Sequence, residues 1–482
     1  MNKKKKQKAL GKLKVATMES LQPINVHAAG LDIGASEIYA AVAPGSSDES
    51  VRVFPTFTID LYALAEWLAS CSVTSVAMES TGVYWIPVYE ILESKGFEVY
   101  LVNARHVHQT GSPKTDVLDC QRIQQLHSYG LLRGSFHPSE DIRAIRALVR
   151  HRENLLQSRA THIQHMQKAL HLMNVQLTNV LSDITGVTGM NIIRAILAGR
   201  HDPHYLAHFR DPRCAKSEEE IAKSLQGNYR REHLFALRQA VELYDFYTTQ
   251  ITACDCEIEQ QYASLQAQVD PEQAPLPPAK RSGAKSKNSP DYDLRTALYR
   301  ITGVDLTAID GLNVLNVQTI VSEVGTDMSK WPTSKHFCAW LGLAPNNEIS
   351  GGKPLRTDTK PVKSRANLAF RQAAQALANS KSALGAYYRH MRARFGPPVA
   401  NVATAHKLAR IVYAMLKTRE PYHDPGADAY DAQQQAKLLR NLKRNARQLG
   451  LALVPLPPAT VSYTHLRAHE TDSYLVCRLL LE

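Results

Sequence analysis

The stretch NVHAAGLDIGASEIYAAV, residues 25–42, decides how the fold begins. Apolar residues alternate with other residues in 25–33 and again in 37–42, and this alternation predicts two β-strands. The segment LDIG at 31–34 places Asp32 at the end of the first strand, directly before a glycine turn. We therefore expect a sheet whose first strand ends in an acidic side chain.

The patterns that follow predict an α/β domain. A third strand at 51–57 precedes alternating helices and strands, which we expect at 61–69 (helix), 75–78 (strand), 86–92 (helix), 97–102 (strand) and 116–132 (helix). Three consecutive strands followed by alternating elements are the order of an RNase H-like fold. We predict that residues 25–135 form this domain.

The middle of the chain has a different pattern. Apolar residues between 142 and 177 keep helical spacing, which predicts a long helix within a helical region at 136–265. We expect this helix to pair with a second one near 235–265 as an antiparallel coiled coil. A helical hairpin inside a single compact domain is the alternative. Residues 266–293 contain five prolines and a basic run, which indicate a linker or a disordered insert.

The C-terminal part of the chain contains an α-rich segment at 294–420, which is followed by a basic helical tail at 421–460. Residues 1–24 include four consecutive lysines and are expected to be a basic, disordered arm. Residues 461–482 continue no pattern and look like a translated sequencing-adapter tail. We interpret them as a non-native extension, with a short native extension as the alternative.

Charge and composition limit the function classes. The 482 residues carry a net charge of +12, which favours a polyanionic partner such as nucleic acid. The seven cysteines are scattered, and the close pair Cys254 and Cys256 lacks zinc-site spacing, so we expect a reduced, cytoplasmic protein. No run approaches about 18 apolar residues, which indicates no membrane span.

Four carboxylates stand where a two-metal site needs them: Asp32, Glu79, Asp116 and Asp119. The first two follow strands, and the last two are three residues apart on one helix face. Hard oxygen ligands suit Mg²⁺, or Mn²⁺ as a substitute, and two ions can clamp both oxygens of a reacting phosphodiester. Each carboxylate alone is typical of a strand end, a helix entry or a solvated face, so the prediction depends on their order.

The segments LDIG, ESTGVYW, VNARHV and KTDVLDC occur in this order and resemble the DEDD transposases of the IS110 family of insertion sequences. The resemblance covers roughly residues 27–180 and 295–420. It implies a RuvC-like catalytic domain joined by a coiled coil to a C-terminal transposase domain. It also implies that the four carboxylates are the acidic tetrad of the active site.

The C-terminal segment IDGLN, residues 309–313, resembles the family's helix-hairpin-helix element, whose loop amides hold a DNA phosphate. Asn313 replaces the usual second glycine, and a helix-turn-helix packing unit is the alternative. The segment SGGK, residues 350–353, resembles the motif that carries the family's nucleophilic serine. By position this serine is Ser350, and Ser364 is the rival.

The same resemblance implies a set of nucleic-acid-binding residues. Ala366 stands where the family has glycine, so the turn there is expected to differ. The implied binding residues are Lys114, Gly311, Gly351, Gly352, Lys353, Lys363, Arg365, Asn367 and Arg371.

Together these features predict a bacterial DNA transposase that is cytoplasmic and nucleoid-associated. The resemblance implies a serine–DNA covalent intermediate, a structured guide RNA and a homo-oligomer, either a dimer or a tetramer. A RuvC-like junction resolvase would use the same carboxylates without Ser350. A catalytically silent nucleic-acid-binding protein is the second alternative.

Overall fold

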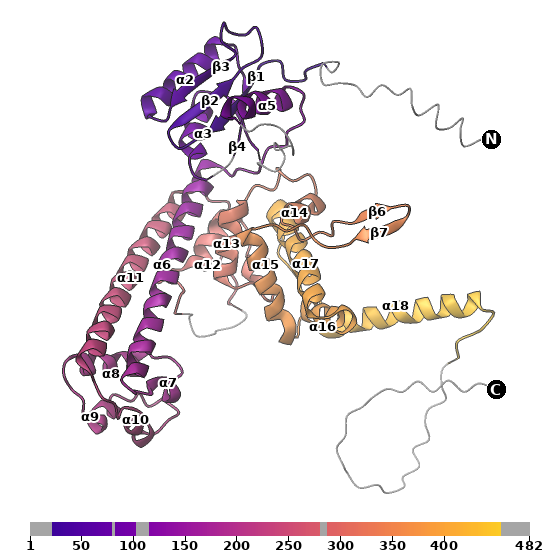
Figure 1. Cartoon of the computed structure of the whole chain (residues 1–482). Helices are drawn as coiled ribbons and strands as arrows, with labels where there is room; N and C mark the ends of the chain where they lie inside the picture. Colours follow the sequence, from indigo (N-terminus) through magenta and orange to yellow (C-terminus); the bar gives the residue numbers. More distant parts are fainter. Residues whose placement is uncertain (1–21, 80–81, 103–114, 280–286, 455–482) are drawn as a thin grey trace.

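The computed structural model describes residues 22–79, 82–102, 115–279 and 287–454 (Figure 1). Nearly all of the basic arm and the whole extension at 461–482 lie outside these residues. The segment VNARHV, apart from its first residue, and Lys114 lie outside them as well.

The N-terminal domain is a five-stranded mixed sheet with helices on both faces. The strands lie in the order β3-β2-β1-β4-β5; β1, β2 and β3 pair antiparallel, whereas β4 and β5 run parallel to β1. This arrangement fits the predicted RNase H-like domain. The elements are β1 (Ala28–Ile33), β2 (Glu37–Ala41), β3 (Val51–Pro55), α2 (Thr58–Ser70), β4 (Ser75–Glu79), α3 (Trp85–Ser94), β5 (Glu98–Val102) and α5 (Asp116–Ser128).

Alternation along β1 and β4 divides the domain core between the two faces of the sheet. Leu31 and Met78 belong to the larger cluster, which includes α2 and α3, whereas Ala77 packs with Ile123 of α5 on the other face. Helix α5 ends at Ser128 rather than at the predicted residue 132. The chain turns there, and Gly130 adopts a positive φ of 65° that favours glycine.

Two long helices, α6 (Glu140–Leu172) and α11 (Arg231–Ser264), form the predicted pair in the middle of the chain (Figure 1). They run antiparallel, since Ile145 near the start of α6 packs with Ile258 of α11, and Met166 near its end packs with Leu237. Helix α6 stops before the predicted residue 177 because Asn174 adopts a left-handed φ of 57°. The two helices form a hairpin, and their winding around each other as a coiled coil stays a prediction.

Four short helices close the far end of this hairpin around their own core (Figure 1). They are α7 (Leu177–Val180), α8 (Val187–Leu197), α9 (Pro203–Ala207) and α10 (Glu218–Ser224). Residues 266–279 and 287–293 contain neither helix nor strand, in keeping with a linker. None of the described helices combines the length and the apolar character needed to cross a membrane.

The C-terminal domain is helical, with one small hairpin of strands. Its core is rich in alanine on α15 and α17, which lets these helices approach closely. The basic helix α18 extends from it (Figure 1). The elements are α12 (Leu294–Thr302), η2 (Leu306–Ala308), α13 (Val314–Val324), α14 (Ser334–Trp340), β6 (Glu348–Ser350), β7 (Lys353–Arg356), α15 (Arg365–Ala376), η3 (Leu377–Asn379), α16 (Ala383–Phe395), α17 (Pro397–Thr418) and α18 (Ala427–Gln448).

Candidate active site

Asp32 and Glu79 end two neighbouring parallel strands at the same level. Leu31 of β1 pairs in register with Met78 of β4, so the two acidic residues are the next along each strand. Side chains alternate along a strand, and Gly30 and Ala77 face α5, so Asp32 and Glu79 are on the α5 face as well. Both carboxylates therefore stand at one edge of the sheet and on one face.

Helix α5 brings the other two carboxylates to the same edge. It runs antiparallel to β1, since Gln124 near its C-terminal end donates its Nε2 hydrogen to the carbonyl oxygen of Ala28 (3.3 Å), whereas Cys120 lies against Gly30. The first turn of α5, which carries Asp116 and Asp119, consequently points toward the end of β1 that carries Asp32.

The local sequence explains why α5 begins where it does. The Thr115 hydroxyl accepts a hydrogen bond from the backbone N–H of Leu118 (3.3 Å), which satisfies one of the free donors of the first turn. Asp116 and Asp119 in that turn also interact favourably with the helix dipole. The helix start is therefore stabilised by the acidic residues that the site requires.

Two neighbouring groups are influenced by these charges. The pKa of the Cys120 thiol is raised to about 12, chiefly by burial and also by the carboxylates of Asp32 and Asp119. The pKa of Tyr39 is raised chiefly by its hydrogen bond to Glu37 (3.2 Å), and Asp32 and Asp116 raise it as well. Asp32 and the first turn of α5 thus share one electrostatic neighbourhood.

Sequence reasoning missed Tyr39. It pairs directly with Asp32 across β1 and β2, so both side chains project from the same face of the sheet. The alternation of residues 37–42 would have revealed this face once the hairpin register was known. The phenol O–H of Tyr39 donates to Glu37 (3.2 Å) beside this acidic edge.

The structure brings the tetrad to one edge of the sheet, and a shared metal site there stays a prediction. Among the residues that the structure describes, no three His, Cys, Asp or Glu side chains are placed to hold a metal ion together. Strand and helix direction bring the four carboxylates to one edge, but their side chains do not form a finished ligand shell.

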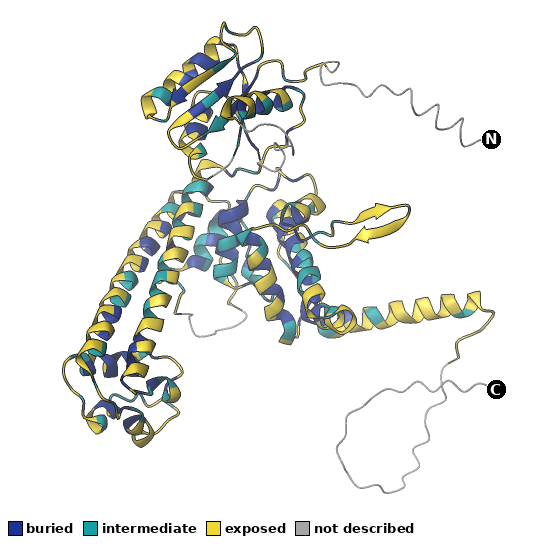
Figure 2. Cartoon of the chain, in the orientation of Figure 1, coloured by how far each residue is buried: buried dark blue, intermediate teal, exposed yellow. Residues whose placement is uncertain are grey.

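Ser350 lies on a hairpin that extends from the C-terminal domain (Figure 1), and β6 and β7 are exposed throughout (Figure 2). Ser350 pairs with Lys353, and the two glycines between them, Gly351 and Gly352, have φ angles of 56° and 79°. A two-residue hairpin turn of this kind requires positive φ at both central positions, which glycine supplies at little steric cost. The serine hydroxyl is thus presented to solvent at a tight tip.

The rival serine has a structural partner. Ser364 is the N-cap of α15, and its hydroxyl accepts a hydrogen bond from the backbone N–H of Asn367 (3.3 Å). The Asn367 side chain donates to the carbonyl oxygen of Leu341 (2.7 Å), and Arg365 is paired with Glu153 of α6. These three residues hold the start of α15 in place, whereas Lys353, Lys363 and Arg371 are exposed.

The element at 309–313 is a tight connection between η2 and α13. Gly311 has a φ of 91°, and a β-carbon there would lie 2.6 Å from the carbonyl oxygen of Ala373, so its glycine is required for packing. Asn313, which replaces the second glycine, caps α13 by accepting a hydrogen bond from the backbone N–H of Asn316 (2.8 Å). Both residues have structural roles that the helix-turn-helix alternative anticipates.

The sheet order and the acidic edge fit an RNase H-like domain, which is joined to a helical domain. Residues 29–175 match a family described as a DEDD transposase of IS110 type, and residues 303–389 match a family described as transposase IS116/IS110/IS902. In both its N-terminal and its C-terminal domain the chain is thus similar to transposases of the IS110 family.

One curated relative supports this placement. The chain is 29% identical over 127 residues to a probable family 20 transposase of Pseudomonas aeruginosa. The match covers 25% of this chain and 37% of the relative, so the chain spans little more than a third of the curated relative that it matches.

Proposed function

We propose that this protein is a DNA transposase that cuts and rejoins strands by using two chemical centres in different domains. The observation that supports it best is the antiparallel packing of α5 on β1, which places the first turn of α5 beside the end of the strand with Asp32. The similarity to transposase families supports DNA as the substrate.

The acidic centre comprises Asp32, Glu79, Asp116 and Asp119. Four carboxylates on one edge fit hard divalent cations, for which Mg²⁺ is the natural choice and Mn²⁺ a substitute. When bound, two such ions neutralise charge on the phosphodiester and stabilise the attacking and leaving oxygens. The chain's own residues supply the ligands and hold them on a sheet edge and a helix end.

The second centre is Ser350. Its hydroxyl oxygen attacks the phosphorus of one DNA strand and loses its proton, a P–O bond to deoxyribose breaks, and the released sugar oxygen takes up a proton. The product is a serine–DNA phosphodiester, and attack by a hydroxyl of another strand rejoins DNA and restores the serine. The exposed hairpin tip, with glycines on both turn positions, leaves room for a DNA backbone to approach.

The two centres lie in different domains of one chain (Figure 1). We propose that a homo-oligomer, a dimer or a tetramer, brings Ser350 of one copy to the carboxylates of another. The charge of +12 suits both DNA and a structured guide RNA, which we include in the proposal. A junction resolvase, which needs no serine, is the second candidate. It is favoured by the position of Ser350 in a different domain from the four carboxylates.

The test is a covalent-trapping assay on duplex DNA that carries the element ends. Native protein should give a protein–DNA band on a denaturing gel when Mg²⁺ or Mn²⁺ is present, and chelation should remove it. Asp119→Asn should abolish cleavage while leaving DNA binding near the native level. Cleavage that depends on Asp119 without any covalent product would replace the transposase with the resolvase.

A further inference from the structure

Helix α18 leaves the C-terminal domain as a single helix, and nearly all of its surface is exposed (Figures 1 and 2). Tyr430, in its first turn, is its one buried residue. At about 1.5 Å per residue the helix is roughly 33 Å long, which is close to one turn of a nucleic-acid duplex.

The two sides of α18 have different chemistry. At about 100° per residue, its five cations fall within an arc of roughly 120°, and three leucines occupy the opposite side. From 432 to 454 the sequence contains no acidic residue, so this part of the arm carries five positive charges without internal compensation. The cations are Lys437, Arg440, Lys443, Arg444 and Arg447, and the leucines are Leu438, Leu439 and Leu442.

The five cations are available to an external anion. All five are exposed, and the ion pairs found among the described residues include none of them. Long basic side chains on a single helix face are the form in which a protein neutralises consecutive phosphates and releases their counterions.

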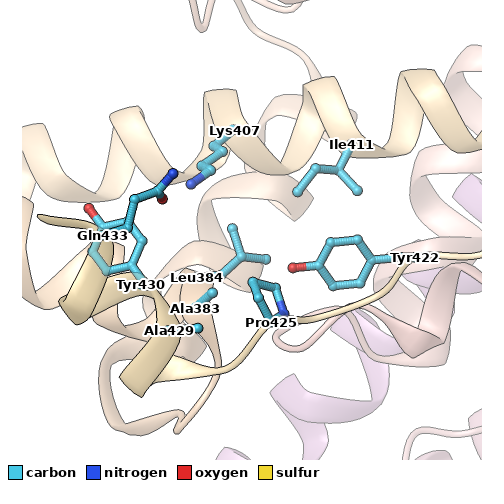
Figure 3. Close-up of a pocket in the computed structure, with 9 residues that line it drawn as sticks. All are labelled: Ala383, Leu384, Lys407, Ile411, Tyr422, Pro425, Ala429, Tyr430 and Gln433. Carbon is cyan, nitrogen blue, oxygen red and sulfur yellow. The ribbon is translucent and has the colours of Figure 1, made fainter. Parts of the chain in front are cut away.

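The base of α18 is fixed, so the arm has a defined direction. The Lys407 ammonium of α17 lies 4.5 Å from the ring centroid of Tyr387 and 5.5 Å from that of Tyr430. The backbone N–H of Ala427 also donates to the carbonyl oxygen of Lys381 (3.1 Å). Figure 3 shows Lys407 and Tyr430 beside a pocket of about 540 Å³ between α16, α17 and α18.

We propose that α18 is a nucleic-acid-binding arm whose basic face contacts the phosphates of a duplex outside the candidate active site. The charge pattern and exposure of the helix call for a polyanion, and its identification as a nucleic acid rests on the proposed function. Phosphates are common to DNA and RNA duplexes, so the experiment uses both.

The experiment measures binding of the full-length chain to a 30-base-pair DNA duplex and to an RNA duplex of the same length, over a range of salt concentrations. The test variant changes Lys437, Arg440, Arg444 and Arg447 to glutamine, which has a helix propensity close to that of lysine and arginine. The matched control places glutamine at Leu438, Leu439 and Leu442. Circular dichroism and melting temperature verify that each variant is folded.

We expect the basic-face variant to bind at least about tenfold more weakly at 0.1 M salt, with a salt-dependence slope smaller by about three to four. The leucine-face control should bind like the native chain, and the duplex that loses more affinity identifies the natural partner. If the quadruple variant misfolds, the single variant Arg444→Gln should still lower the slope by about one.

Native affinity and slope in the basic-face variants would overturn the proposal. An equal loss of affinity in the leucine-face control would also overturn it, because it would assign the arm to self-association. The cleavage assay keeps the two hypotheses separate. A native protein that binds through α18 but never cleaves DNA would refute the proposed function and leave the arm intact.

Discussion

A β-carbon on Gly30 would lie 2.5 Å from the carbonyl oxygen of Cys120, which means that β1 and α5 touch backbone to backbone. The backbone nitrogen of Gln124 would lie even closer, at 2.2 Å. Only glycine allows this approach, and it is the approach that brings the first turn of α5 beside Asp32. A glycine two residues before the acidic residue thus sets the position of half of the candidate tetrad.

Gly30→Ala should therefore weaken both the fold and the candidate site. Because the nearest atoms belong to a backbone, α5 must shift, and we expect the free energy of unfolding to fall by about 1–3 kcal/mol in chemical denaturation. Metal-dependent cleavage should fall too, since Asp116 and Asp119 move with the helix. The matched control is Gly134→Ala, where the nearest atom is a ring carbon of the Tyr100 side chain at 3.3 Å. Equal stability of the two variants would contradict this account.

The two serines should separate stability from chemistry. Ser350 is exposed at a hairpin tip, so Ser350→Ala should change the free energy of unfolding by less than about 0.5 kcal/mol and yet abolish the covalent protein–DNA product. Ser364→Ala removes a helix cap and should lower the free energy of unfolding by about 0.5–2 kcal/mol, while the covalent product still forms. Thermal melts and the denaturing-gel assay measure both quantities. The reverse pattern would make Ser364 the nucleophile.

The hairpin of α6 and α11 contains a buried ion pair. Arg152 donates to Asp255, with Nη2 to Oδ2 at 3.0 Å, and also to the carbonyl oxygen of Asn288 (2.9 Å). Asp255→Asn leaves the buried guanidinium without its counter-charge, and we expect the free energy of unfolding to fall by about 3–5 kcal/mol. The exposed pair of Arg194 and Asp245 is the control, where Asp245→Asn should cost less than about 1 kcal/mol. Urea titration measures the free energy of unfolding of both variants. Similar losses in the two would refute the larger contribution of the buried pair to stability.

His137, near the start of α6, should make stability depend on pH. The pKa of His137 is lowered from 6.5 to about 4, chiefly by burial and also by the positive charges of Arg143 and Arg146. Its ring packs 4.3 Å from that of Tyr89, between centroids. The unfolded chain takes up the proton first, so the free energy of unfolding should be constant above pH 6.5 and fall as the pH decreases toward 4. We expect the free energy of unfolding to fall by roughly 2 kcal/mol over this range. His137→Gln should remove this part of the pH dependence.

The order of the elements was predictable because it depends on local patterns. Alternation in 25–33 and 37–42 located β1 and β2, and helical spacing located α6 and α11, each within a few residues of their observed bounds. The errors are at the ends, where single residues such as Asn174 adopt positive φ. Apolar periodicity contains no information about such a backbone angle.

The roles of the C-terminal residues were only partly predictable. The pairing of Arg365 with Glu153 joins residues that are more than 200 positions apart, and no local pattern predicts it. The phosphate-binding role of Gly311 stays a prediction, and the structure adds a packing requirement for glycine there, against Ala373. The motif at 350–353 was predicted to carry the serine, whereas the tight hairpin turn at its two glycines appears only in the structure.

The sequence by itself determined the chemical inventory: four carboxylates in a fixed order, a serine before two glycines, and a basic tail. It determined these because residue type and spacing along the chain are read directly. Only the tertiary structure decided that α5 runs antiparallel to β1, that Tyr39 faces the side of Asp32, and that Ser350 stands apart on an exposed hairpin. Direction and distance between elements come from packing between residues far apart in the chain, and the close contact at Gly30 is such a case.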